Sequence, residues 1–118
     1  MTVQVKRVYE QATKQDGVRV LVDRLWPRGL TKEQAHIDKW MKDIAPSSQL
    51  RQWYDHDPAK WTEFKKRYFK ELEARKPTIK SLCEETLENT LTLVYSSRQK
   101  DYNNATALKE FMETMGFQ

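Results

Sequence analysis

Two short apolar runs constrain the fold of this chain more than any other feature of the sequence. They read V-R-V-L-V at residues 18–22 and L-T-L-V-Y at residues 91–95, and such runs are typical of strands that are covered on both faces. The intervening residues 23–90 are too many for a hairpin loop and carry helical patterns. We therefore predict parallel pairing of the two strands through a right-handed crossover. Valines at positions 3, 5 and 8 indicate a further strand near the N-terminus.

Capping residues and apolar spacing predict helices in the other segments. A capping box starts at Thr31, and Ser47 is a candidate cap for a second helix. Asp57 and Pro58 begin a third, whose apolar residues recur every three or four positions and which we expect to end near Pro77. The same spacing predicts two more helices, with Ile79, Leu82, Cys83, Thr86 and Leu87 on the apolar face of one and Ala105, Leu108, Met112 and Met115 on that of the other.

These elements predict one fold class for the whole chain. We expect residues 1–118 to form a single α/β domain with a small, mainly parallel sheet of three or four strands and helices on both faces, in three layers. No apolar run approaches membrane-spanning length, and the N-terminus lacks the apolar stretch of a signal peptide. The single cysteine, Cys83, excludes an internal disulfide and fits a reducing compartment, so we expect a cytoplasmic protein. The sequence does not indicate an oligomeric state.

The segment D-R-L-W-P-R-G, which directly follows the second strand, is the main candidate site. Ligands of open parallel sheets bind at the carboxyl ends of strands. Arg24 and Arg28 offer forked donors for a carboxylate or phosphate, Trp26 provides a wall or a stacking surface, and Gly29 permits a close backbone approach. Asp23 is suited to orient an arginine or to accept a proton. A structural interpretation fits equally well, with an ion pair between Asp23 and Arg24 and with Trp26 closing the edge of the core.

Polar residues after the third predicted strand extend the candidate site. Ser96 and Arg98 follow that strand, and Asn103 begins the last helix. Their hydroxyl, guanidinium and amide groups complete an anion pocket in one interpretation, whereas in the other Ser96 and Asn103 only cap the local turn.

His56 is the second candidate catalytic residue, beside Asp23. It lies between two aspartates just before the long third helix and is a candidate base or acid, although a role as a helix cap explains it better. His36, His56 and Cys83 lack the spacing of metal ligands, so we predict neither a metal nor a cofactor. Cys83 lies on an apolar stripe and is expected in the core.

Six segments in the same order carry a resemblance to a known family. The quoted segments are R-V-L-V-D-R-L-W-P-R-G (Arg19 to Gly29), D-I-A-P-S (Asp43 to Ser47), L-R-Q-W-Y-D-H-D-P (Leu50 to Pro58), W-T-E-F-K-K-R-Y (Trp61 to Tyr68), L-T-L-V-Y-S-S-R (Leu91 to Arg98) and N-N-A (Asn103 to Ala105). Together they resemble the YeaO-like family of small bacterial proteins, classed as domain of unknown function 488. The resemblance implies a single α/β domain with motif residues at both strand ends, and it implies no particular activity.

One stretch departs from a common pattern of that family. Many members resemble R-D-x-x-H-N-H-A or R-D-x-x-H-N-N-A from the arginine that matches Arg98. Here Gln99 stands in place of the acid and Tyr102 in place of the first histidine. A mechanism that needs an acid and an imidazole at these two positions lacks both groups in this chain.

The net charge of +4 favours anionic partners. We expect a small anionic or nucleotide-like ligand at the strand ends, with hydrolase or transferase chemistry as an open option. A nucleic-acid accessory protein is a less favoured alternative, because the lysines of the long helix are interleaved with acids as on a solvated face. A protein-interaction module is the third, and it requires an exposed apolar patch that includes Trp40, Trp53 or Tyr54. We expect no membrane partner.

Overall fold

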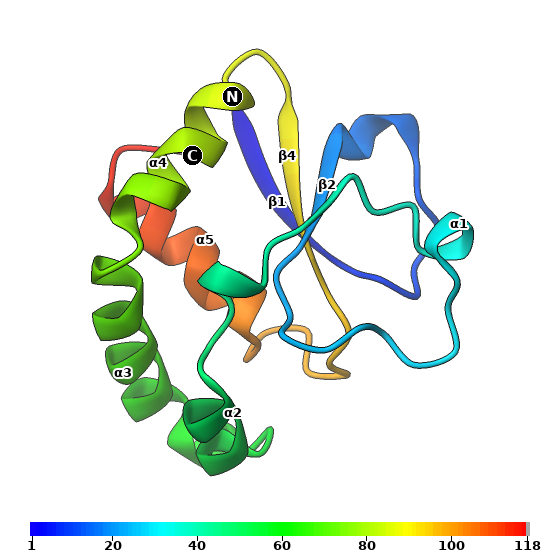
Figure 1. The fold of residues 1–118 in the computed structure, drawn as a ribbon. Coiled ribbons are helices and arrows are strands. Elements are labelled where there is room, and N and C mark those ends of the chain that lie inside the picture. The colour runs from blue at the N-terminus through cyan, green and yellow to red at the C-terminus, as the bar shows by residue number, and fades with distance from the viewer. Residues whose placement is uncertain (118) are drawn as a thin grey trace.

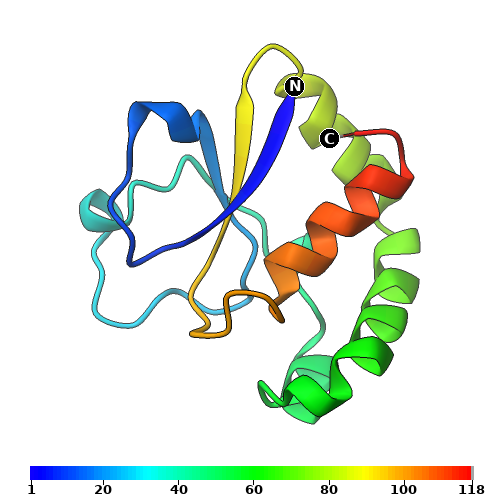
Figure 2. The same ribbon diagram turned by 180° about the vertical axis from the view of Figure 1, so that it is seen from behind.

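The computed structural model describes residues 1–117, in which four parallel strands form one sheet (Figures 1 and 2). The strands are β1 (Thr2–Arg7), β2 (Val18–Leu21), β3 (Lys39–Trp40) and β4 (Thr90–Tyr95). Their order across the sheet is β1-β4-β2-β3, and every neighbouring pair is parallel. The predicted parallel sheet is confirmed. The sequence gives no separate signal for β3, because a two-residue strand shows no periodicity.

Within residues 1–117, five α-helices and three short 3-10 turns accompany the strands, and the last helix follows the last strand. They are α1 (Lys32–Ala35), α2 (Ser48–Tyr54), α3 (Trp61–Glu73), α4 (Lys76–Glu85) and α5 (Asn104–Thr114), with η1 (Lys14–Asp16), η2 (Lys42–Ile44) and η3 (Pro58–Lys60). The predicted caps are present. Thr31 accepts a hydrogen bond from the backbone of Gln34, Ser47 caps α2, and Asp57 caps η3, which leads directly into α3.

Two predicted helix details are wrong. The long helix does not end near Pro77: α3 ends at Glu73, and Pro77 lies in the first turn of α4, where a residue without an N–H is tolerated. Leu87 does not belong to the apolar face of α4. It lies beyond the end of that helix and is 48% exposed, whereas Thr86 is buried and donates to the Leu82 carbonyl.

Helices cover both faces of the sheet, as predicted, but the two outer layers are unequal. In Figure 1, α3, α4 and α5 lie on one side of the strands and α1 on the other. The main core cluster includes Leu93 of β4 together with Tyr68 of α3, Ile79 of α4 and Leu108 of α5. Val94, the next residue of β4, belongs to a smaller cluster with Ala35 of α1. Successive strand residues therefore face a thick helical layer and a thin one.

A buried charged network lies on the thin side. Asp16 accepts hydrogen bonds from Arg19 Nη1 at 2.6 Å, from Lys6 Nζ at 3.1 Å and from the backbone N–H of Thr13 at 3.1 Å. The hydroxyl of Thr92, in the central strand β4, donates to the Asp16 carbonyl at 2.6 Å. Asp16 and Arg19 are 2% and 4% exposed. The network thus links η1 to three strands in a region with little apolar packing.

The stability of the protein is expected to fall in acid because of this network. Burial raises the pKa of Asp16, but hydrogen bonds from Thr13, Lys6 and Arg19 outweigh it and lower the pKa from 3.8 to about 2. Because the folded-state pKa is the lower one, the ionised carboxylate adds about 2 kcal/mol to the free energy of unfolding at neutral pH. This contribution is lost as the pH falls from about 5 to 2.

Urea unfolding between pH 6 and pH 2 measures this loss, with Asp16→Asn as the matched control. The wild type is expected to lose about 2 kcal/mol more than the variant over that range. Parallel curves for the two proteins would show that Asp16 does not contribute to the acid sensitivity.

The carboxyl ends of β1, β2 and β4 lie at one edge of the sheet, next to α2 and away from the marked chain ends (Figure 1). No helix within residues 1–117 is long and apolar enough to cross a membrane.

Candidate functional site

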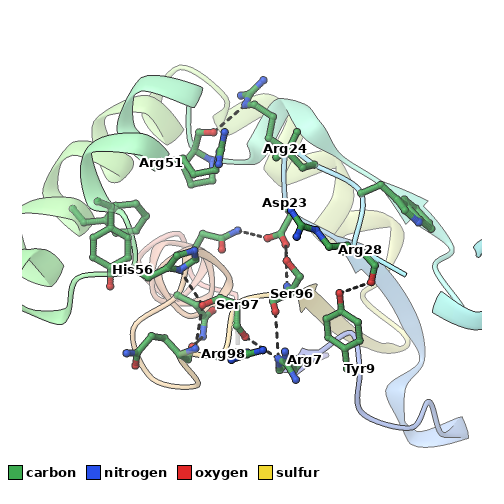
Figure 3. Close-up of a pocket in the computed structure, with 18 residues that line it drawn as sticks. Arg7, Tyr9, Asp23, Arg24, Arg28, Arg51, His56, Ser96, Ser97 and Arg98 are labelled. Atoms are coloured by element: carbon green, nitrogen blue, oxygen red, sulfur yellow. Dashed lines mark hydrogen bonds between the residues drawn. The ribbon is translucent and has the colours of Figure 1, made fainter. Parts of the chain in front are cut away.

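A cleft of about 1020 Å³ opens at the carboxyl edge of the sheet (Figure 3). The segments that follow β1, β2 and β4 line it, together with α2 and the loop after α2. The labelled side chains in Figure 3 surround an open central space, with His56 and Arg51 on the α2 side and Asp23 and Arg28 on the strand side. Segments far apart in the sequence thus meet at the position where open parallel sheets bind ligands.

Arginine dominates the charge of the cleft. Five of the eight arginines of the chain line it, and none of the thirteen lysines does. Asp23 is the one acidic residue in the lining, which gives these residues a formal charge of +4, equal to that of the whole chain. Among residues 1–117, none of the five forms a salt bridge with a carboxylate. The five are Arg7, Arg24, Arg28, Arg51 and Arg98.

Two of these arginines are held in place by backbone carbonyls. Arg7 Nε donates to the carbonyls of Ser97 at 3.0 Å and Ser96 at 3.3 Å, and Arg24 Nε donates to that of Pro46 at 3.0 Å. A neutral carbonyl positions a guanidinium group without cancelling its charge. In Figure 3 the Arg24 guanidinium extends away from the centre of the cleft, so Arg24 contributes to the rim.

Asp23 joins three elements instead of pairing with Arg24. Its Oδ2 accepts from the backbone N–H of Ser96 at 2.9 Å and from the Ser96 hydroxyl at 2.7 Å. Its Oδ1 accepts from Asn104 Nδ2 at 3.1 Å. Both carboxylate oxygens are therefore occupied, and the residue ties the end of β2 to the end of β4 and to the first turn of α5.

Trp26 belongs mainly to the core edge. Its Nε1 donates to the Leu30 carbonyl at 2.7 Å, and its ring packs edge-on against Trp40, with 5.3 Å between the centroids. The residue is half-buried against the smaller core cluster and contributes to the cleft lining. Gly29 has a φ of +81°, as a turn glycine does, and lies outside the lining.

A hydrogen bond between the side chains of His56 and Ser97 joins the loop after α2 to the loop after β4. The His56 Nδ1 to Ser97 Oγ distance is 3.2 Å. His56 has a φ of +55°, which is uncommon for a residue other than glycine. Ser97 Oγ also accepts from the backbone N–H of Gln99 at 3.1 Å.

Asn103 lines the cleft but caps a helix. Its side-chain oxygen accepts from the backbone of Thr106, and its Nδ2 donates to the carbonyls of Gln99 and Lys100. Eight of the nine predicted site residues thus lie in the cleft lining, all except Gly29.

Sequence reasoning missed several lining residues, chiefly Arg7, Tyr9, Arg51 and Tyr54. The Tyr9 hydroxyl donates to the Arg28 carbonyl at 2.8 Å, and the Tyr54 hydroxyl donates to the Tyr102 carbonyl at 2.7 Å. Burial, with smaller contributions from Asp57 and Tyr102, raises the pKa of Tyr54 to about 12, so its hydroxyl stays protonated at neutral pH. The strand-end rule could have indicated Arg7 and Tyr9. No local signal places α2 beside the sheet.

Comparison with known proteins agrees with the motif resemblance. Residues 2–116 match a family model described as the inactive DUF488-N3 subclade. This chain belongs to the DUF488 family. It is 36% identical over 115 residues to the uncharacterized protein YeaO of Escherichia coli K12. This alignment covers 98% of this chain and 100% of YeaO. It is 39% identical over 110 residues to the uncharacterized protein Rv3073c of Mycobacterium tuberculosis H37Rv, covering 93% and 92% of the two chains. No solved structure matches.

The two departures from the DUF488 pattern lie in different surroundings. Gln99, in place of the acid, lines the cleft, so this wall carries a neutral amide. Tyr102, in place of the histidine, is 40% exposed and lies outside the lining, with its ring 5.5 Å from that of Trp61.

Cys83 of this DUF488 protein is fully buried, and burial raises the pKa of its thiol to about 11. The thiol is therefore protonated at neutral pH, which agrees with a core role. Neither Tyr54, which is 5% exposed, nor the half-buried Trp53 forms an exposed patch with Trp40.

Proposed function

We propose that this protein binds a small anionic ligand, of the phosphate type, in the arginine cleft and does not convert it. The main support for this proposal is that five guanidinium groups lie in one cleft and that, among residues 1–117, none of them forms a salt bridge with a carboxylate. Guanidinium groups match the oxygens of phosphate and carboxylate in pairs, which an ammonium group cannot do. The use of arginine to the exclusion of lysine supports recognition of such a group.

Three observations support binding without conversion. The matching family model is described as inactive. The acid and the histidine of the common family pattern are replaced by Gln99 and Tyr102. Both oxygens of Asp23, the one acid in the lining, are engaged in structural hydrogen bonds.

A small ligand fits the cleft better than a nucleic acid does. The arginines line a concave space, whereas the basic face of α3 is neutralised in part by ion pairs such as Arg67 with Glu63 and Lys65 with Glu110. A nucleic-acid surface favours an unpaired basic stripe.

Hydrolysis or group transfer is the second candidate, and one contact favours it. The Ser97 hydroxyl lies 3.2 Å from His56 Nδ1, a geometry in which an imidazole can accept the proton of an attacking hydroxyl. Release of inorganic phosphate from a bound phosphate ester by the wild type, absent in Ser97→Ala, would favour this candidate over simple binding.

Arg28→Gln is expected to weaken the binding of pyrophosphate about 10- to 100-fold, because one charge-assisted hydrogen-bond donor is lost. Arg24→Gln is expected to have a smaller effect, since its Nε already bonds the Pro46 carbonyl and its guanidinium lies at the rim. Isothermal titration calorimetry at two salt concentrations measures the affinity of both variants for pyrophosphate.

Arg75→Gln is the matched control for these variants, because Arg75 is exposed and lies outside the cleft. It is expected to bind pyrophosphate as the wild type does. Equal affinity in the wild type, Arg28→Gln and Arg75→Gln would rule out the cleft as the anion site.

A further inference from the structure

Two exposed apolar side chains on the cleft walls are not explained by anion binding. Tyr9 is 42% exposed and Leu25 is 59% exposed, and both line the cleft. They are two of the five large apolar side chains that are exposed within residues 1–117. An inorganic anion or a small dicarboxylate leaves both in water. A ligand that carries a flat apolar group beside its anionic end has a surface for such a side chain to contact.

The ring of Tyr9 is fixed before any ligand arrives. Its hydroxyl donates to the Arg28 carbonyl at 2.8 Å, which ties it to the loop after β2. The Arg7 guanidinium lies over the ring, 4.6 Å from the centroid. Arg7 is itself held by the carbonyls of Ser96 and Ser97 after β4. A ring fixed in this way loses little conformational freedom when a ligand binds.

The position of Tyr9 couples an aromatic surface to the anion site. Arg7, whose guanidinium lies over one face of the ring, and Arg28, whose carbonyl holds the hydroxyl, are both arginines of the cleft. A planar group that stacks on the exposed part of Tyr9 therefore lies near guanidinium groups. These groups can bind a phosphate that is attached to the same ligand.

We propose, on the basis of the anion site above, that the ligand is a nucleoside phosphate whose base stacks on Tyr9 while its phosphate meets the arginines. Every nucleobase has a π-face, and stacking on an aromatic side chain strengthens binding by about 5- to 150-fold per base. A sugar phosphate lacks this surface and leaves Tyr9 exposed. The same chemistry is found in a free mononucleotide and in the phosphorylated end of a nucleic acid.

Titration calorimetry with adenosine monophosphate, ribose 5-phosphate and a short 5′-phosphorylated RNA tests the proposal. Adenosine monophosphate is expected to bind the wild type at least about tenfold more tightly than ribose 5-phosphate. Tyr9→Leu is expected to remove this difference, whereas Tyr9→Phe, which keeps the ring, is expected to retain most of it. Affinity for the RNA equal to that for the mononucleotide identifies a free nucleotide as the ligand, and clearly higher affinity identifies the nucleic-acid end.

Tyr102→Ala is the matched control, because Tyr102 is exposed to the same extent as Tyr9 but lies outside the cleft lining. It is expected to keep the preference for the nucleotide. Equal binding of adenosine monophosphate and ribose 5-phosphate to the wild type would overturn the stacking proposal and leave the anion site in place. Failure of pyrophosphate and of all three probes to bind would overturn both proposals.

Discussion

Asp16→Asn is expected to lower the free energy of unfolding by about 3–5 kcal/mol, since removal of one partner of a buried ion pair leaves the other charge uncompensated. Arg19 is 4% exposed, and its Nη1 donates to the Asp16 carboxylate at 2.6 Å. The remaining hydrogen bonds of the Arg19 guanidinium go to the carbonyls of His36 and Ala35, which carry no compensating charge. Denaturant unfolding followed by tryptophan fluorescence at pH 7 measures the change.

Glu63→Gln is the control for this experiment. Glu63 also accepts from an arginine, Arg67 at 3.0 Å, but both side chains are about half exposed. Exposed pairs of this kind contribute about 0–1 kcal/mol. If Asp16→Asn costs no more than Glu63→Gln, the network on the thin side does not hold η1 to the sheet.

Asp23→Ala is expected to lower the free energy of unfolding by about 3 kcal/mol, because three hydrogen bonds to its carboxylate are lost at an edge that water partly reaches. It is also expected to abolish ligand binding in the arginine cleft. The Ser96 backbone and Asn104 lose their common partner, and the loops after β2 and β4 are then free to separate. Chemical unfolding and calorimetric titration of one sample measure the two effects.

This result distinguishes the role of a proton acceptor, which the sequence allows for Asp23, from the structural role that its hydrogen bonds indicate. A proton acceptor can be replaced with little loss of stability, whereas a residue that joins three elements cannot. Asp101→Ala is the control, since Asp101 is an exposed aspartate in the loop after β4, outside the cleft lining. Unchanged stability of Asp23→Ala would return Asp23 to the role of a candidate base.

Much of the fold was predictable because its main signals are either local or depend on the number of residues between two strands. The apolar runs at residues 18–22 and 91–95 are sufficient to indicate strands, and the long helical segment between them excludes a hairpin. Caps such as Thr31 and Ser47 act within four residues, so the sequence shows them directly. The two-residue strand β3 lacks such a signal. Pro77 indicates a break between α3 and α4, but it lies in the first turn of α4 and not at the end of α3.

The candidate site was predictable mainly where it follows a strand. Arg24, Arg28 and Arg98 come after β2 or β4, and the geometry of parallel sheets is enough to bring them together. Arg51 and His56 reach the cleft from α2 and its following loop, and their position depends on how α2 packs. No rule of spacing could give that position.

The type of a residue also does not show whether its polar atoms contact a ligand or form hydrogen bonds within the fold. Asp23 and Asn103 have the chemistry of site residues, yet their polar atoms are used to hold the chain. Arg7 was overlooked because it lies at the end of a strand that no motif follows, yet it supports both Tyr9 and the loop after β4.

The like charges in the cleft also affect the stability of the folded chain. Five guanidinium groups that share one cavity repel one another, and mobile counter-ions weaken that repulsion over roughly 10 Å at 0.1 M salt. Ordinary surface ion pairs respond in the opposite sense, because salt weakens their attraction. At this edge of the sheet, added salt therefore weakens an unfavourable contribution to the stability of the folded chain instead of a favourable one.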